Sequence, residues 1–109
     1  KESYESKVPM ILEALNAPET LELSVNKETF IIGKSTIDAD GVISFNSAIS
    51  RTHCKITQTS SGFQLEDLQS TNGTYLNNVR LQAFEPVGLK NGDVIRLANT
   101  DFRVRMMDR

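Results

Sequence analysis

The chain has 109 residues, which is enough for one domain with a single two-layer core. Its formal net charge of −2 argues against a protein that binds the DNA or RNA backbone, because such domains carry a clear basic excess. One cysteine and one histidine give no basis for an internal disulfide or a Cys/His metal site, and no stretch approaches the roughly 18 apolar residues that span a bilayer. A single thiol is typical of a reducing compartment, so the sequence favours a cytoplasmic protein with no metal, cofactor, nucleic acid or membrane insertion.

Residues 1–18 differ in character from the rest of the chain. Ser6 is a possible helix cap, and Pro9 suits the first turn of a helix. The apolar residues that follow would share one helical face: Ile11, Leu12 and Leu15. The pattern predicts a tail or linker remnant with a short helix, followed by the domain proper at residues 19–109.

From residue 20 onward, short runs with period-two alternation are separated by turn residues. Asn72-Gly73 and Asn91-Gly92 are strong tight-turn signals. Nine to eleven short strands with a turn every eight to twelve residues are typical of an all-β antiparallel sandwich, whose recognition sites lie on loops at one end. The clearest predicted strands are Leu21–Val25, Thr29–Ile32, Val42–Phe45, His53–Gln58, Phe63–Leu68, Ile95–Leu97 and Phe102–Met106.

Three predicted loops collect side chains that donate hydrogen bonds to small anions. They are Gly33-Lys34-Ser35, Ser50-Arg51-Thr52-His53 and Ser70-Thr71-Asn72-Gly73-Thr74. Each has a purely structural interpretation when taken alone: a capping serine, a solvated charge or a tight turn. Their joint occurrence between strands indicates one binding site assembled from loops.

The ordered set Gly33-Lys34, Ser50-Arg51-x-His53, Ser70-x-Asn72-Gly73-Thr74 and Asn77 resembles the forkhead-associated (FHA) domain family over about residues 20–107. The resemblance implies a sandwich of about eleven strands that binds phosphothreonine peptides through loops at one end. It implies phosphate contacts from Lys34, Ser50, Arg51 and Thr71, and a contact from Asn72 to the peptide backbone. It implies supporting roles in the loops for Gly33, His53, Gly73 and Asn77. The Ser-Arg-x-His motif with compact loops is typical of bacterial members.

Position 34 departs from the family pattern, which usually has arginine there. Lysine is a point charge without the planar fork of a guanidinium, so we expect weaker binding, with Arg51 able to take the bidentate contact. A phosphothreonine carries about −1.5 to −2 charges and three acceptor oxygens, which hydroxyl and cationic donors satisfy. The resemblance therefore implies a partner protein phosphorylated by a Ser/Thr protein kinase, and a signalling role for the interaction.

Two rival functions remain open from the residues alone. An enzyme would need a nucleophile and a base, but the neighbouring His53 and Cys54 on one strand should face opposite ways, and Cys54 reads as a core residue. We therefore predict no catalytic residue. The alternative is a scaffold or interaction domain that uses the same sandwich independently of phosphate, which would bind phosphorylated and unphosphorylated peptides equally.

Overall fold

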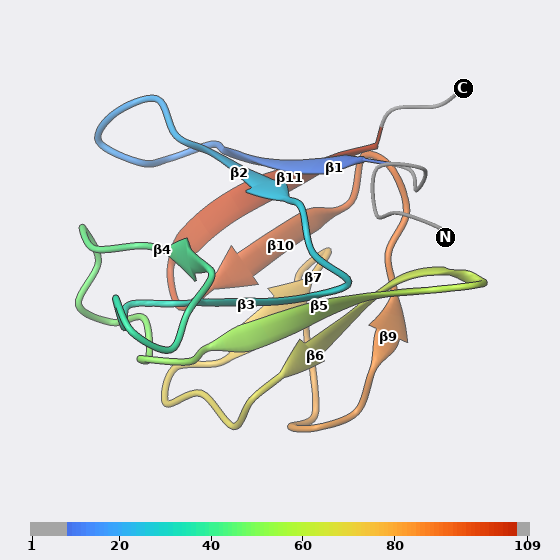
Figure 1. The fold of residues 1–109 in the computed structure, drawn as a ribbon. Coiled ribbons are helices and arrows are strands. Elements are labelled where there is room, and N and C mark those ends of the chain that lie inside the picture. The colour runs from blue at the N-terminus through green and yellow to red at the C-terminus, as the bar shows by residue number, and fades with distance from the viewer. Residues whose placement is uncertain (1–8, 107–109) are drawn as a thin grey trace.

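The structure, a computed structural model, describes residues 9–106 as two β-sheets packed face to face (Figure 1). Among these residues there is no helix. The strands are β1 (Met10–Ala14), β2 (Glu22–Val25), β3 (Thr29–Gly33), β4 (Gly41–Val42), β5 (Cys54–Thr59), β6 (Gly62–Asp67), β7 (Thr74–Leu76), β8 (Val79–Arg80), β9 (Val87–Gly88), β10 (Val94–Leu97) and β11 (Thr100–Met106).

One sheet has the order β2-β1-β11-β10-β7-β8 and is antiparallel throughout. The other has the order β4-β3-β5-β6-β9 and is antiparallel except where β4 runs parallel to β3. The predicted all-β sandwich of about eleven strands is thus confirmed. The two-residue β4 is shorter than the predicted strand at 42–45, and the chain then enters a long loop.

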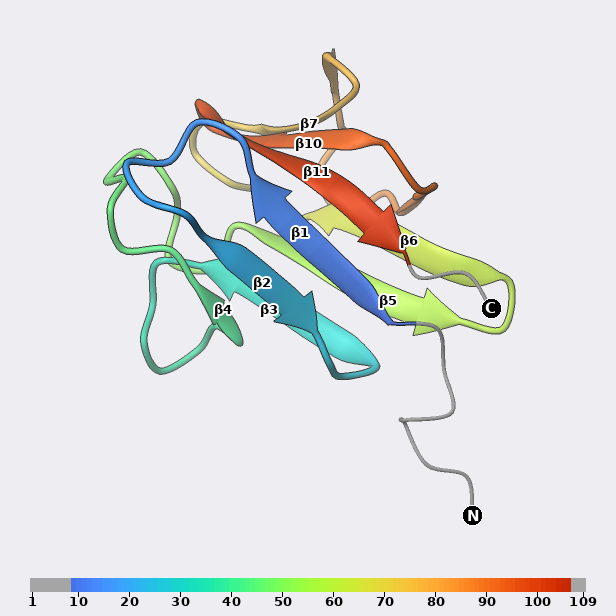
Figure 2. The ribbon, with the colours of Figure 1, turned by 90° about the horizontal axis from the view of Figure 1, so that it is seen from above.

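The prediction of a helix near residue 9 is wrong. Met10–Ala14 forms strand β1, which lies between β2 and β11 inside its sheet (Figure 2). Met10 and Leu12 are each 1% exposed, because they alternate inward while Ile11 and Glu13 lie on the less buried face. A short apolar run fits both the helical and the strand period, and pairing with two neighbouring strands decides between them. The sandwich therefore includes residues assigned to the tail; residues 1–8 of that prediction lie outside the described part.

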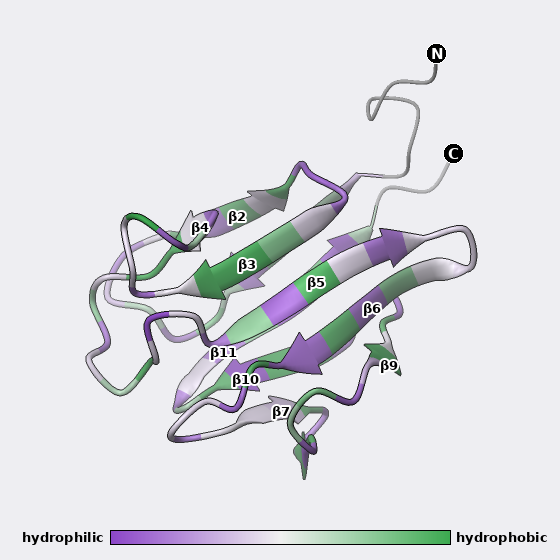
Figure 3. Cartoon of the chain, turned by 60° about the horizontal axis from the view of Figure 1, so that its bottom comes forward, coloured by the Kyte–Doolittle hydropathy of each residue, from purple (hydrophilic) through white to green (hydrophobic). Residues whose placement is uncertain are grey.

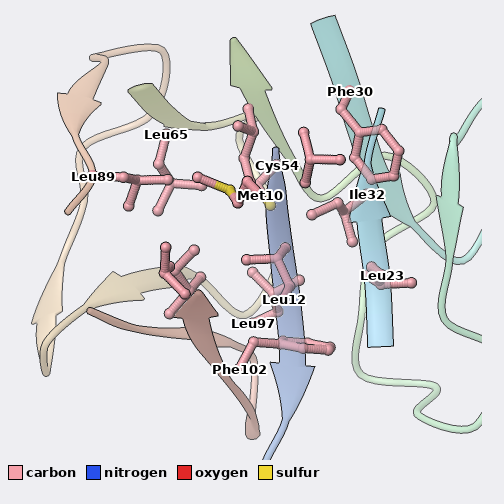
Figure 4. Close-up of a cluster of buried hydrophobic side chains, with 14 of the residues drawn as sticks. Met10, Leu12, Leu23, Phe30, Ile32, Cys54, Leu65, Leu89, Leu97 and Phe102 are labelled. Carbon is pink, nitrogen blue, oxygen red and sulfur yellow. The ribbon is translucent and has the colours of Figure 1, made fainter. Parts of the chain in front are cut away.

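Alternating side chains from both sheets form the core. Along β5 and β6 buried residues alternate with more exposed ones, and the buried ones are apolar except for Gln58 and Asp67. The hydropathy colouring changes from residue to residue along both strands (Figure 3). Leu12, Leu97 and Phe102 from one sheet meet Ile32 and Leu65 from the other (Figure 4). This burial fixes the strand register, because a slip by one residue would turn each apolar set outward.

Cys54 lies in this core, as predicted, and is fully buried and free. Burial raises the pKa of its thiol far above the ordinary range, so the thiolate that a nucleophile requires does not form at neutral pH. The cysteine acts as a small apolar side chain.

The strand register brings the three candidate loops to one end of the sandwich. Ile32 pairs with Cys54, and Cys54 pairs with Asp67, so the end of β3, the start of β5 and the end of β6 lie side by side. The loops at 34–40, 43–53 and 68–73 all leave from this edge, on the left of Figure 1. The sheets therefore fix where the loops begin, and the loops can then contact one another.

Candidate anion-binding site

The first two candidate loops are joined through their backbones. The Lys34 N–H donates to the Ser50 carbonyl at 3.0 Å, and the Ser35 N–H donates to the Arg51 carbonyl at 3.1 Å. These bonds continue the pairing of β3 with β5 beyond the end of the regular sheet. Gly33 permits the approach, because a Cβ there would collide with the Arg51 carbonyl oxygen and come within 2.9 Å of the Ser50 oxygen. The Cα atoms of Lys34, Ser50 and Arg51 are thereby held close together.

The second and third loops are joined by side chains. The Ser50 Oγ accepts the Thr71 N–H at 3.0 Å, and the Asn72 Nδ2 donates to the Ala48 carbonyl at 2.8 Å. Because Ser50 uses an acceptor lone pair for Thr71, its own O–H stays available to donate to a ligand. The structure thus brings Ser50, Thr71 and Asn72 together.

His53 lies beneath these loops and is fully buried. Its Nδ1 accepts the Ser50 N–H at 3.0 Å, so its Nε2 carries the proton and donates to the Gly73 carbonyl at 2.8 Å. Burial lowers the pKa of His53, outweighing the Gly73 hydrogen bond and the Asp67 charge, which raise it. The neutral ring therefore connects the loop of Ser50 to the loop of Asn72 and Gly73.

Asp67 organises the third loop, although the sequence pattern assigned it no role in the site. Its carboxylate accepts hydrogen bonds from the Ser70 Oγ at 2.6 Å, the Ser70 N–H at 3.2 Å and the Thr74 Oγ1 at 2.6 Å. The Ser70 Oγ in turn accepts the Gly73 N–H at 3.0 Å. A signal was present, because Asp67 falls on the inward side of the alternation in β6, and a buried carboxylate requires nearby donors.

The two cations of the site are exposed at its rim. The Lys34 Nζ donates to the Ser47 carbonyl at 3.2 Å, and the Arg51 Nη2 lies 3.9 Å from an Asp38 carboxylate oxygen. Thr71 is exposed as well. The arrangement offers two positive charges, two hydroxyls and an amide, all of them donors to an anion.

Asn77 lies away from this network. It has φ of 50° and Asn78 has φ of 71°, so the pair forms the tight turn between β7 and β8, as a type I′ turn requires. The Asn77 Oδ1 accepts the Val94 N–H at 2.9 Å, and its Nδ2 donates to Asp93 at 3.1 Å. Its hydrogen bonds therefore support the β7–β8 hairpin against β10 and do not reach the three loops.

A shallow hollow of about 290 Å³ adjoins the loops and is lined by Ala48, Asn72, Ala98 and Asn99. Within residues 9–106, no three His, Cys, Asp or Glu side chains cluster as a metal ion would need. That same part of the chain has no helix long and apolar enough to cross a membrane.

Comparison with known proteins places this geometry in a family. The family model for the FHA domain matches residues 30–98. FhaA of Mycobacterium tuberculosis, an FHA domain-containing protein, is 41% identical over 61 residues, and the E3 ubiquitin-protein ligase CHFR of Xenopus tropicalis is 40% identical over 76 residues. The matches cover 56% and 68% of this chain but 11% and 12% of those proteins.

A solved FHA domain, described for its phosphothreonine-dependent interactions, superposes with a TM-score of 0.79 at 29% identity. The alignment covers 94% of this chain and all of the other. The matched segment from β3 to β10 contains each of the three loops. The chain belongs to the FHA domain family.

Proposed function

We propose that the domain binds protein segments that carry phosphothreonine, with the phosphate held by Lys34, Ser50, Arg51 and Thr71. The observation that carries the proposal is the hydrogen bond from the Thr71 N–H to the Ser50 Oγ, which closes two loops around one set of donors. A domain of similar structure is described for phosphothreonine-dependent interactions, which supports the same ligand class here.

The two cations and the two hydroxyls contribute to phosphate binding in different ways. Lys34 and Arg51 supply charge-assisted hydrogen bonds worth roughly 1.5–3 kcal/mol each, and the hydroxyls of Ser50 and Thr71 fix where the phosphate oxygens lie. Asn72 holds the peptide backbone beside the phosphothreonine with its amide. Association and peptide ordering oppose these gains, so we expect a Kd on the order of micromolar.

The site supplies donors and no reactive group, so the proposed role is recognition without catalysis. This recognition would bring a substrate of a Ser/Thr kinase to the protein that contains this domain. The matched relatives are far longer than this chain, which spans about an eighth of their length or less. The buried free Cys54 is compatible with the reducing cytoplasm, where we place the interaction.

The test is titration calorimetry with a library of phosphothreonine peptides and their unphosphorylated copies. We expect binding to the phosphorylated peptides alone, and its loss in Ser50→Ala. Ser24→Ala is the matched control, because Ser24 is an exposed serine on β2 in the other sheet. Equal binding of both peptide sets would contradict the proposal and favour a phosphate-independent scaffold.

A further inference from the structure

Asp38 is held beside one of the two cations of the site. Its carboxylate lies 3.9 Å from the Arg51 Nη2, and the two side chains are 57% and 70% exposed. Its position is set by the backbone. The buried Ser35 Oγ accepts the Asp38 N–H at 2.9 Å and the Ile37 N–H at 3.2 Å, while the Ser35 N–H bonds to the Arg51 carbonyl. The same short turn thus connects Asp38 to the backbone of the residue whose charge it faces.

The carboxylate of Asp38 is free to act on Arg51, unlike the other acid of the loop. Asp40 accepts hydrogen bonds from the Ile31 N–H at 2.8 Å and the Lys27 Nζ at 2.7 Å, and these contacts lower its pKa. The only side-chain hydrogen bond of Asp38 within residues 9–106 is a long one from the Ser35 Oγ, at 3.4 Å. Two short hydrogen bonds thus fix the carboxylate of Asp40 in the loop, whereas the carboxylate of Asp38 accepts only this long one.

We propose that Asp38 occupies Arg51 in the unliganded domain and so sets the affinity of the site for phosphate. This rests on the proposed function of the loops. An incoming phosphate dianion must share the Arg51 guanidinium with Asp38 or displace the Asp38 carboxylate from it. The negative charge of Asp38 also repels the phosphate. The three loops at 34–40, 43–53 and 68–73 carry two cations, Lys34 and Arg51, and Asp38 partly offsets the charge of Arg51. The acid thereby lowers the affinity for phosphate by a modest factor.

The size of the effect follows from the exposure of the pair. Exposed ion pairs contribute little and are screened by salt, so removing the carboxylate changes affinity by a modest factor of about two to five. The backbone turn at Ser35 does not need the carboxylate, because the Asp38 N–H makes the bond. Asp38→Asn keeps that bond and the shape of the side chain while it removes the charge.

The experiment is a peptide titration at low and high salt with wild type, Asp38→Asn and Glu28→Gln. Glu28 precedes β3 at the opposite end of the strand from Gly33, and the change removes the same charge there. We expect Asp38→Asn to lower the Kd for the phosphothreonine peptide about two- to fivefold at low salt. The gain should shrink at high salt and be absent in Glu28→Gln. Asp38→Ala serves as a second variant, and a thermal melt verifies that each is folded.

The dependence on Arg51 is tested by a double-mutant cycle. Adding Asp38→Asn to Arg51→Gln should produce a smaller gain than it does in wild type, because the exchange partner is missing. The proposal is overturned if wild type binds and the Asp38 variants bind no more tightly, if Glu28→Gln gains equally, or if the gain is undiminished without Arg51. Absence of binding by wild type and all variants would overturn the proposed function, and this inference with it.

Discussion

At Gly33, the absence of a side chain lets two loops touch. An added Cβ would meet the Arg51 carbonyl carbon at 2.6 Å and the Ser50 oxygen at 2.9 Å, and both are backbone atoms that cannot rotate away. We expect Gly33→Ala to lower the free energy of unfolding by about 1–3 kcal/mol, the usual cost of overpacking, and to weaken phosphopeptide binding. Urea denaturation and peptide titration measure the two effects. Gly88→Ala is the control, because a Cβ there meets nothing within 4 Å; equal losses in both variants would refute this account.

His53 makes the loops sensitive to pH. A proton on Nδ1 would oppose the Ser50 N–H and place a charge inside the protein, which is why burial lowers the pKa of the folded ring. The unfolded chain therefore binds this proton more readily, near pH 6.5. The contribution of His53 to stability is complete above that pH and is lost as the pH falls from there toward the folded pKa. We expect urea denaturation to show a lower free energy of unfolding at about pH 5.5 than at about pH 7.5.

The control for this pH effect is His53→Gln, because the chain has a single histidine. The variant should be less stable at pH values near neutral, yet its stability should change little across the same interval. Ordinary carboxyl groups titrate around pH 4, well below the interval from about pH 5.5 to about pH 7.5. An unchanged pH slope in His53→Gln would mean that another group is responsible.

Among the elements, β1 contributes two almost fully buried side chains to the core. Met10 and Leu12 are each 1% exposed and pack between the sheets, while Ile11 on the same strand is only partly buried on the outer face. We expect Leu12→Ala to cost about 2–5 kcal/mol of unfolding free energy, and Ile11→Ala much less. Chemical denaturation distinguishes them. A loss in Ile11→Ala as large as that in Leu12→Ala would contradict the inward placement of alternate residues.

The strands that sequence could predict are those whose pattern is decided locally. Residue type alternates with period two along β2, β5, β6 and β11, and burial alternates in the same way, so the sequence alone predicts these strands. β1 was mistaken for a helix because its five residues gain their conformation from β2 and β11, one of which lies some ninety positions away. The two-residue strands β8 and β9 carry too little pattern to be recognised, and the strand predicted at 42–45 overlaps the two-residue β4 only at Val42.

The site residues also divide into those that the sequence could predict and those that it could not. Ser50, Thr71 and Asn72 could be named from their residue types and order, and hydrogen bonds from Thr71 to Ser50 and from Asn72 to Ala48 join their two loops. Asp67 and Asp38 were missed because their importance lies in which donors and charges the fold places beside them. The tight turn at 77–78 was also missed, since two asparagines with positive φ replace the usual Asn-Gly pair.

For the whole molecule, core and site are formed by different residues. The core side chains point between the sheets, while Lys34, Arg51 and Thr71 are exposed on loops at one end. The connection between the two parts is the buried His53 and Asp67, which bond to the loops from below. Changes at the rim should therefore alter binding without unfolding the domain, and changes in the core should do the reverse.

This separation gives a prediction for two matched variants. Lys34→Ala combined with Arg51→Ala removes two charge-assisted contacts worth roughly 3–6 kcal/mol together, so phosphopeptide affinity should fall at least about a hundredfold. Its melting temperature should stay within about 4 °C of wild type, because exposed substitutions cost about 0.5 kcal/mol or less each.

Leu65→Ala, at a fully buried position of β6, should instead cost about 2–5 kcal/mol and lower the melting temperature by about 10 °C or more. Its folded fraction should bind the peptide nearly as wild type does at low temperature, because Leu65 contributes no donor to the loops. Calorimetric melts and peptide titrations on the same samples measure both quantities. A rim variant that melts as early as Leu65→Ala would show that the ligand donors also hold the sandwich together, which would contradict the separation.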